Sequence, residues 1–255
     1  ISVTGVQTCA LPISRDAVSL ASTAKLDVHL DGYADSDTRQ ASAGNVTLGV
    51  GDAGAIDVVS GAAIDLGTRR TGDRLIPHTQ FDPVTLVPVT AYSFIEADKG
   101  GTLTLCAPVI GNGVPVTFAG SVSGGRDITV EVYRRYDLAQ IANDPNFSGV
   151  TISGNVAALD VGASAAGRTN FLSGTGTGTI ADFIQNFDIS GSDATLGNLT
   201  SLSTFHRRPG VQLDYAGDIR LDSNWNLGAG TVDIAGAIAD GDMRVSGLGT
   251  AGNPL

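Results

Sequence analysis

Three histidines and several aspartates are the residues best suited to chemistry in this 255-residue chain. His29, His78 and His206 lie far apart, and none has a neighbour at a spacing typical of metal ligands. The sequence contains no GxSxG, HExxH or P-loop pattern, which would indicate a nucleophilic serine, a zinc hydrolase or a phosphate-binding loop. We therefore predict structural or surface roles for the histidines, with no catalytic, cofactor-binding or metal-binding residue and no cofactor.

Two short motifs invite a binding function and are better explained as loops. Gly49–Gly54 matches the dinucleotide fingerprint GxGxxG, but Ala55–Val59 after it alternates like a strand, whereas the motif needs a helix there. Asp31, Asp35 and Asp37 offer oxygen ligands for calcium, but their spacing is not that of an EF-hand or of a glycine-aspartate nonapeptide. We interpret the first motif as a turn and the second as a solvated loop.

Four other aspartates stand between apolar residues in predicted strands and therefore face outward: Asp57, Asp65, Asp127 and Asp233. A glycoside-cleaving enzyme needs two or three carboxylates that converge on one face. Such convergence depends on strand register, which one sequence does not reveal. Outward aspartates also keep a sheet surface soluble, and we favour that interpretation.

The elements that position these side chains follow a repeated pattern: one polar residue between two apolar residues, then a turn rich in Gly, Asp or Asn. Each unit is too short to bury its own apolar face, so the units must stack in an all-β solenoid. A repeat of about 20 residues predicts roughly 7–9 coils. Nine units, mostly eight to thirteen residues apart, show the pattern: Val46–Leu48, Ile56–Val58, Ile64–Leu66, Leu103–Leu105, Val116–Phe118, Ile128–Val130, Ile219–Leu221, Val232–Ile234 and Met243–Val245.

The composition agrees with a turn-rich, acidic β protein. The net charge is −11, Glu96 and Glu131 are the only glutamates, and Lys25 and Lys99 are the only lysines. Helix surfaces favour Glu and Lys, whereas Asp, Asn and Gly favour turns. The acidity argues against nucleic acid as a partner, because phosphates would be repelled. No run of about 18 apolar residues occurs, so we predict no membrane-spanning segment.

Residues 1–14, ISVTGVQTCALPIS, resemble the in-frame translation of a common short-read sequencing adapter. They lack the basic start and continuous apolar core of a signal peptide. We expect residues 1–14 to be an adapter-derived artefact and the rest to be an internal fragment of a longer reading frame. Cys9 belongs to this stretch, which leaves Cys106 as a small core residue without a disulfide.

The remaining chain divides into three predicted parts. Residues 15–137 form a β-helix segment, interrupted at about 68–98 by a proline-rich loop or projecting hairpin. Residues 138–206 form an insert, and residues 207–255 resume the β-helix as a truncated segment.

The insert contains one predicted helix at about 179–187. Ile180, Phe183, Ile184 and Phe187 have helical spacing, and Thr179 can cap the first turn. We expect its apolar stripe to pack on the flank of the solenoid. Just before the insert, the tyrosines of the run 133–136 (YRRY) are predicted to cover the edge of the core where the chain leaves the solenoid.

Two blocks of sequence carry a family resemblance. The first runs from Gly100–Pro108 through Val130–Asp137. The second contains Gly197–Leu202, then Phe205–Leu213 with its Arg-Pro-Gly centre, then Gly217–Leu227 with Trp225. In this order, with an insert between them, the blocks resemble the filamentous haemagglutinin family of large exported proteins.

The resemblance implies a right-handed parallel β-helix that a dedicated two-partner transporter exports across the outer membrane. Members of this family act in attachment to surfaces and cells, and some carry a toxin at the far end. We therefore expect a shaft segment of a secreted bacterial adhesin at the cell surface, which presents other regions and is not an enzyme. Its surface ligand is not identified. The alternatives are a carbohydrate-active β-helix enzyme and the stalk of a contact-dependent toxin.

Overall fold

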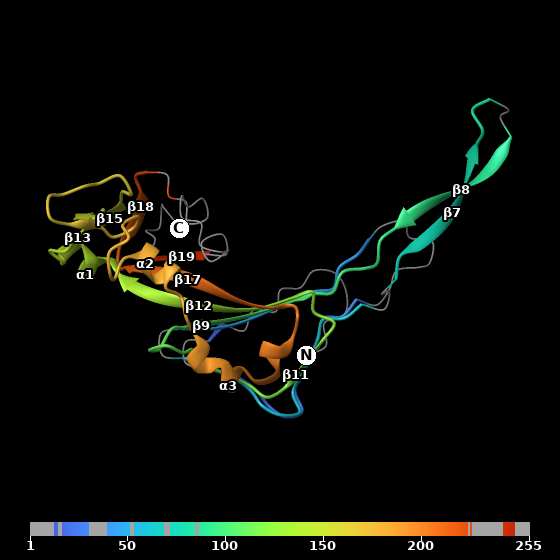
Figure 1. Ribbon diagram of the computed structural model, residues 1–255, viewed down its shortest axis with the longest axis horizontal. Helices are drawn as coiled ribbons and strands as arrows, with labels where there is room; N and C mark the ends of the chain where they lie inside the picture. The colour runs from blue at the N-terminus through green and yellow to red at the C-terminus, as the bar shows by residue number, and fades with distance from the viewer. Residues whose placement is uncertain are drawn as a thin grey trace.

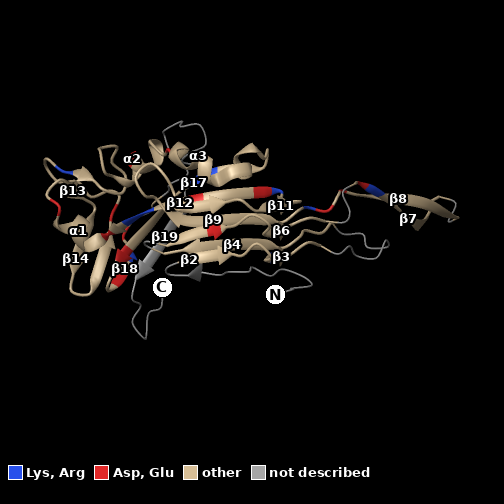
Figure 2. Cartoon of the chain, turned by 90° about the horizontal axis from the view of Figure 1, so that it is seen from below, with Lys and Arg blue, Asp and Glu red and all other residues tan. Residues whose placement is uncertain are grey.

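Strands dominate the structure, as predicted for an all-β chain. The computed structural model describes residues 13–14, 17–30, 40–51, 54–68, 72–84, 87–223, 225 and 242–247. Most of its strands belong to three sheets in which every neighbouring pair is parallel. Figure 2 shows these strands stacked side by side and running in one direction.

The first sheet is the longest and has the spatial order β1–β4–β9–β12–β17–β19. The second sheet has the order β10–β5–β2, and the third has the order β11–β6–β3. The chain therefore passes through the first, second and third sheets in the same order three times. The strands of the first sheet are β1 (Ile13–Ser14), β4 (Asn45–Val50), β9 (Thr102–Pro108), β12 (Asp127–Asp137), β17 (Phe205–Tyr215) and β19 (Asp242–Gly247).

The second and third sheets consist of shorter strands, because turns follow each other closely there. In chain order they are β2 (Ala17–Leu20), β3 (Lys25–Asp27), β5 (Ala55–Val58), β6 (Ala63–Asp65), β10 (Val116–Phe118) and β11 (Ser121–Ser123).

The repeated sequence units are confirmed as strands wherever the structure describes them. Seven of the nine lie wholly inside strands, Ile64–Leu66 overlaps β6, and Val232–Ile234 lies outside the described residues. The predicted coil of about 20 residues is too short: Leu103 and its partner Ile128 are 25 residues apart, Val18 and Ile56 are 38 apart, and Ile56 and Val116 are 60 apart because the hairpin projects between them. The longest sheet has six strands in the described part of the chain, fewer than the predicted number of coils.

One hydrophobic core lies between the three parallel sheets. Alternation along each strand sends apolar residues inward, and the register stacks them on like residues of the next strand. Leu48, Leu105 and Val130 form one such row in the first sheet, and Ile56 and Val116 form another in the second. All five are buried in this first core.

The predicted projecting loop is a long antiparallel hairpin. Its strands, β7 (Arg74–Phe81) and β8 (Pro88–Ile95), pair along their whole length. Figure 1 shows this hairpin reaching far from the rest of the molecule. Pro77 and Pro88 fit here because a two-stranded ribbon has free edges, where a missing N–H costs no ladder hydrogen bond.

The insert contains the predicted helix together with elements that the sequence did not predict. Helix α2 spans Ile180–Gln185, and the backbone N–H of Asp182 donates to Thr179 Oγ1 at 3.1 Å, which confirms the predicted cap. The other elements are α1 (Leu138–Asn143), β13 (Phe147–Ser148), β14 (Val150–Ser153), β15 (Val156–Leu159), β16 (Thr169–Asn170), α3 (Asp193–Leu196) and two 3₁₀ turns, η1 (Ser190–Ser192) and η2 (Gly197–Ser201).

A second core lies under the insert. Ile180, Phe183 and Ile184 of α2 pack there with Val211 and Leu213 of β17. Strands β12 and β17 are long enough to reach both cores, so they connect the two parts of the molecule. Strand β18 (Asp218–Leu221) pairs in parallel with β15, which pairs antiparallel with β14, so these three strands form a separate sheet.

Strand β17 starts inside the predicted insert, which was expected to end at residue 206. Its Pro209 lies in register with Val132 of β12, whereas β19 pairs with β17 only from Gly210 onward. Among the described residues, Pro209 therefore has a strand neighbour on one side only, and a proline without an N–H is tolerated at such an edge position.

Helical turns of the insert cover the free edge of the second sheet. The Ser192 hydroxyl accepts a hydrogen bond from the Val114 backbone N–H at 2.6 Å, and Asn198 Nδ2 donates to the Gly120 carbonyl at 3.2 Å. Leu196 and Leu199 complete the first core above β10. The segment η1–α3–η2 thus protects an edge strand that would otherwise be open to pairing.

Gly197 is required in this cover. Its φ is 57° and its ψ is −130°, and a Cβ atom would lie 2.4 Å from the Phe118 carbonyl oxygen. We expect Gly197→Ala to destabilise the protein by about 1–3 kcal/mol more than Gly111→Ala. Gly111 is the matched control, since its φ is 60° but no atom lies within 4 Å of the position that an added Cβ would take. Urea unfolding of both variants measures the difference, and equal midpoints would contradict the described packing.

Candidate functional site

The hairpin β7–β8 has one face without charge. Residues that pair directly across an antiparallel ribbon share a face. This uncharged face, called the apolar face below, consists of three apolar cross-strand pairs, Leu75 with Phe94, Pro77 with Tyr92, and Phe81 with Pro88, and one threonine pair, Thr79 with Thr90. The opposite face is mixed and includes Arg74, His78 and Gln80.

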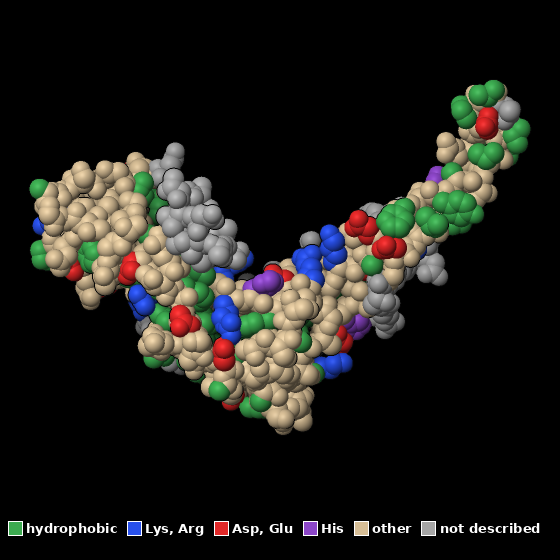
Figure 3. All heavy atoms as spheres, viewed as in Figure 1, with side chains coloured by type: hydrophobic (Ala, Val, Ile, Leu, Met, Phe, Trp, Pro, Cys, Tyr) green, Lys and Arg blue, Asp and Glu red, His purple; other side chains and the backbone are tan. Residues whose placement is uncertain are grey.

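The apolar face is open to solvent. Leu75, Phe81, Tyr92 and Phe94 are 62%, 63%, 62% and 61% exposed, and Val84 at the tip is 87% exposed. Figure 3 shows hydrophobic side chains gathered along this projection. Single exposed apolar residues are ordinary, but a contiguous uncharged patch marks a contact surface.

The base of the hairpin is fixed to the body of the protein. Asp98 is buried and accepts a hydrogen bond from the Ala41 backbone N–H at 3.0 Å. Gln40 Nε2 donates to Glu96 Oε2 at 3.0 Å, and the Ala97 N–H donates to Asp73 Oδ1 at 2.8 Å. The hairpin is therefore held at its root while its apolar face stays accessible.

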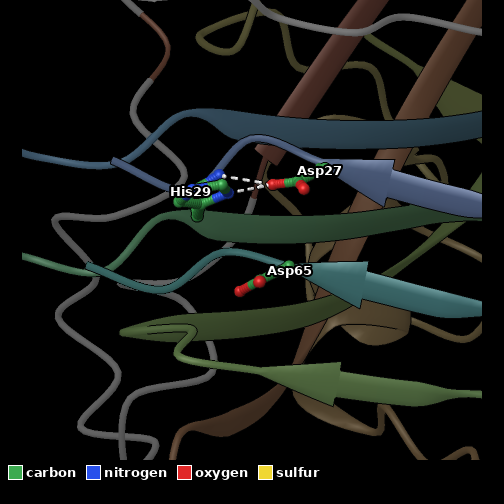
Figure 4. Close-up of side chains that lie close together, drawn as sticks. All are labelled: Asp27, His29 and Asp65. Carbon is green, nitrogen blue, oxygen red and sulfur yellow. Dashed lines mark hydrogen bonds and ion pairs between the residues drawn. The ribbon is translucent and has the colours of Figure 1, made fainter. Parts of the chain in front are cut away.

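A second cluster lies where β3 and β6 end. Asp27 and Asp65 are register partners in the third sheet, and His29 follows two residues after Asp27. One potential ligand atom of each residue lies within 4.8 Å of the other two. Figure 4 shows His29 facing the Asp27 carboxylate, with Asp65 beside them on the neighbouring strand.

Several contacts determine the electrostatics of this cluster. His29 Nδ1 contacts Asp27 Oδ1, and this hydrogen bond holds the pKa of Asp27 below its ordinary value. Lys25 Nζ lies 3.3 Å from Asp27 Oδ2. Asp65 Oδ1 accepts hydrogen bonds from the Gly67 N–H at 3.0 Å and the Ser123 hydroxyl at 3.1 Å.

A shallow polar cleft of about 200 Å³ lies over the start of β12 and β17. His206 Nε2 lies 3.9 Å from Asp127 Oδ1 at its rim, and Arg207 pairs with Asp193. The five lining residues are Asp127, Thr129, His206, Arg207 and Arg208. With charges of both signs and no enclosed apolar wall, the cleft is suited to water or a hydrated ion rather than to an apolar ligand.

The tyrosines of the predicted exit into the insert do cover core edges. Tyr133 is buried, and its hydroxyl donates to the Val50 carbonyl at 2.6 Å. Tyr136 meets the Phe171 ring edge-to-face in the second core, where burial raises the pKa of Tyr136. Arg134 stacks over the Phe183 ring at 4.4 Å. Residues 133–136 thus link the two cores, which agrees with the structural role predicted for this run.

The other residues singled out in the sequence do not converge. His78 lies on the hairpin, where its Nδ1 is 3.3 Å from the Ser93 hydroxyl, and Cys106 is buried as expected of a small core residue. Asp57 lies between Ser19 and Thr117 in the second sheet. Residues 31–39, with the three clustered aspartates, and Asp233 lie outside the described residues.

The glycine-rich Gly49–Gly54 stretch leads from β4 into strand β5, which confirms that a strand and not a helix follows it. The dinucleotide motif is therefore without the helix N-terminus that it needs.

The sequence analysis did not predict two features: the cluster of Asp27, His29 and Asp65, and the apolar face of hairpin β7–β8. The His29 cluster was missed because its third member comes from the next strand, and register cannot be read from one chain. The apolar face of the hairpin could have been predicted from the sequence, since apolar residues recur at every second position from Leu75 to Phe81 except at Thr79.

Comparison with protein-family models, with curated proteins and with solved structures gave no match. None of the described helices is long and apolar enough to cross a membrane.

Proposed function

We propose that this chain is a shaft segment of a large secreted bacterial adhesin or haemagglutinin-like surface protein, which acts by presentation and attachment without catalysis. In this proposal the three parallel sheets are the faces of a right-handed parallel β-helix, and hairpin β7–β8 is the contact element. A two-partner transporter would export the protein to the bacterial surface.

The sheet arrangement supports the shaft. The chain passes through the three sheets in a constant order, and their inward faces share one core. Stacked strands of this kind form a stiff body that holds other regions at a distance. The helical cover over β10 explains how such a body can carry an insert without exposing an edge.

The apolar face of the hairpin is the observation that carries the attachment function. A chain with net charge −11 repels other acidic surfaces, but the apolar face contains no charged residue. Burial of one Leu, Phe or similar side chain contributes about 1.5–3 kcal/mol. Three or four such side chains on one rigid face are enough for a reversible contact.

The test compares adsorption of the whole chain to a phenyl-coated surface with that of two variants. In the first, Leu75→Thr, Tyr92→Thr and Phe94→Thr remove the apolar face while keeping residues that favour strands. We expect its affinity to fall at least about 100-fold, since each 1.4 kcal/mol is tenfold. Ammonium sulfate should strengthen binding of the unaltered chain.

The matched control changes the opposite face of the same hairpin: Ile76→Thr, His78→Thr and Val89→Thr. Its adsorption should equal that of the unaltered chain. If the apolar-face variant adsorbs as well as the control, the proposed contact element is wrong. The rival enzyme function would gain support from turnover on a panel of glycans that is abolished by Asp27→Asn with Asp65→Asn, the pair of carboxylates that the register aligns.

A further inference from the structure

The alignment of Asp27 with Asp65 is unusual on electrostatic grounds. Neighbouring parallel strands lie about 4.8 Å apart, so two carboxylates in register stand close together. Like charges directly opposite each other in a sheet are destabilising. A cation bound between the two carboxylates would replace this repulsion with attraction and so stabilise the sheet.

The third residue gives the cluster a donor that calcium does not favour. His29 lies on the same side as Asp27, because its Nδ1 contacts Asp27 Oδ1 (Figure 4). The set is therefore one imidazole nitrogen and two carboxylate oxygens. Calcium and magnesium take oxygen ligands, whereas imidazole suits zinc and related transition metals.

The distances suit one shared ion. Ligands bound to zinc at about 2.0–2.2 Å in a tetrahedron lie about 3.4 Å from each other. The three ligand atoms already lie within 4.8 Å of one another, so small side-chain rotations bring them to that spacing. The side chains of His29 and Asp27 are only 25% and 23% exposed, which limits competition from water.

Neighbouring groups orient the cluster from outside. The Gly67 N–H and the Ser123 hydroxyl both bind Asp65 Oδ1, which leaves Oδ2 of the same carboxylate to face an ion. Hydrogen bonds of this kind to the ligands of a metal fix their direction and raise affinity. Lys25 pairs with Asp27, but its side chain is 62% exposed and can turn away into solvent.

We propose that Asp27, His29 and Asp65 bind one divalent transition metal ion of the zinc class, with water completing the coordination. The ion links β3 to β6 and thereby joins two successive turns of the chain. Three protein ligands and one water are a common arrangement for zinc. This site is independent of the attachment function, because it lies on the third sheet and not on the hairpin.

The test titrates the metal-free whole chain with Zn²⁺ and, separately, with Ca²⁺, by calorimetry. We expect the unaltered chain to bind Zn²⁺ saturably. In His29→Gln and in Asp65→Asn, one equivalent of bound Zn²⁺ should be lost, or its affinity should fall at least about tenfold. Asp57→Asn is the matched control, since it removes an outward aspartate from the second sheet and should leave binding unchanged. Ca²⁺ should not replace Zn²⁺ at this site.

A spectroscopic arm keeps the result clear if a variant is destabilised. Co²⁺ in place of Zn²⁺ should give visible d–d absorption bands in the unaltered chain and in Asp57→Asn, and the bands should change in His29→Gln. Absence of saturable Zn²⁺ binding by the unaltered chain would overturn the proposal. Identical Zn²⁺ binding and Co²⁺ spectra in all the variants would do the same.

Discussion

Replacing Leu105 by alanine is expected to destabilise the protein by about 2–5 kcal/mol. Leu105 is fully buried in the middle of β9, where its register partners Leu48 and Val130 contact it from both neighbouring strands. Alanine removes the contacts to Leu48 and Val130 and leaves a cavity in the first core, which close packing allows to shrink only in part. The urea midpoint measures this loss.

Thr104→Ala provides the control for Leu105→Ala. Thr104 is the preceding residue of the same strand and faces outward in a row with Thr47 and Thr129. Its replacement should change stability by about 1 kcal/mol or less. If Thr104→Ala is as damaging as Leu105→Ala, the assignment of inward and outward faces is incorrect.

Phe171→Ala should produce the largest effect in the second core, about 3–5 kcal/mol. Phe171 is fully buried, and its ring meets the rings of Tyr136 and Phe147 edge-to-face, with centroids 4.9 and 5.4 Å apart. Such aromatic pairs contribute about 0.5–1.5 kcal/mol beyond the area they bury. The loss should be local, since the insert has its own core.

Hydrogen exchange locates the effect of Phe171→Ala. Amides of β14 and β15 should exchange faster, whereas those of β5 and β10 in the first core should change less. Phe81→Ala serves as the control, because Phe81 is 63% exposed and its loss should change stability by about 0.5 kcal/mol or less. Uniform acceleration across both cores would show that they unfold as one unit.

The sequence predicts the strands well because their signal is local. Units such as Ile56–Val58 have one polar residue between two apolar residues, and the alternation alone assigns their inward faces. The α2 helix is equally local, since its cap and its apolar stripe both lie within Thr179–Phe187. Prolines in the region of about 68–98 correctly indicate a departure from the parallel sheets.

What the sequence does not predict depends on contacts between distant segments. The pairing of Asp27 with Asp65 is a matter of register, and the helical cover over β10 depends on Ser192 meeting Val114 from a distant part of the chain. Strand β14 was missed because Thr151–Ser153 are exposed and have little apolar pattern, and β15 because Val156–Leu159 is a short apolar run without a polar residue between. For the aspartate pair and the helical cover, the determining partner lies on another element.

The claim that hairpin β7–β8 attaches while the parallel sheets support it can be tested by removing the hairpin. Arg74–Ile95 would be replaced by a short Gly-Ser turn, and single chains would be pulled from a phenyl-coated surface by force spectroscopy. The account predicts that detachment events from the phenyl-coated surface disappear, whereas chains tethered covalently at both ends still show the force peaks from unfolding of the parallel sheets. Detachment at an unchanged frequency and force without the hairpin would contradict it.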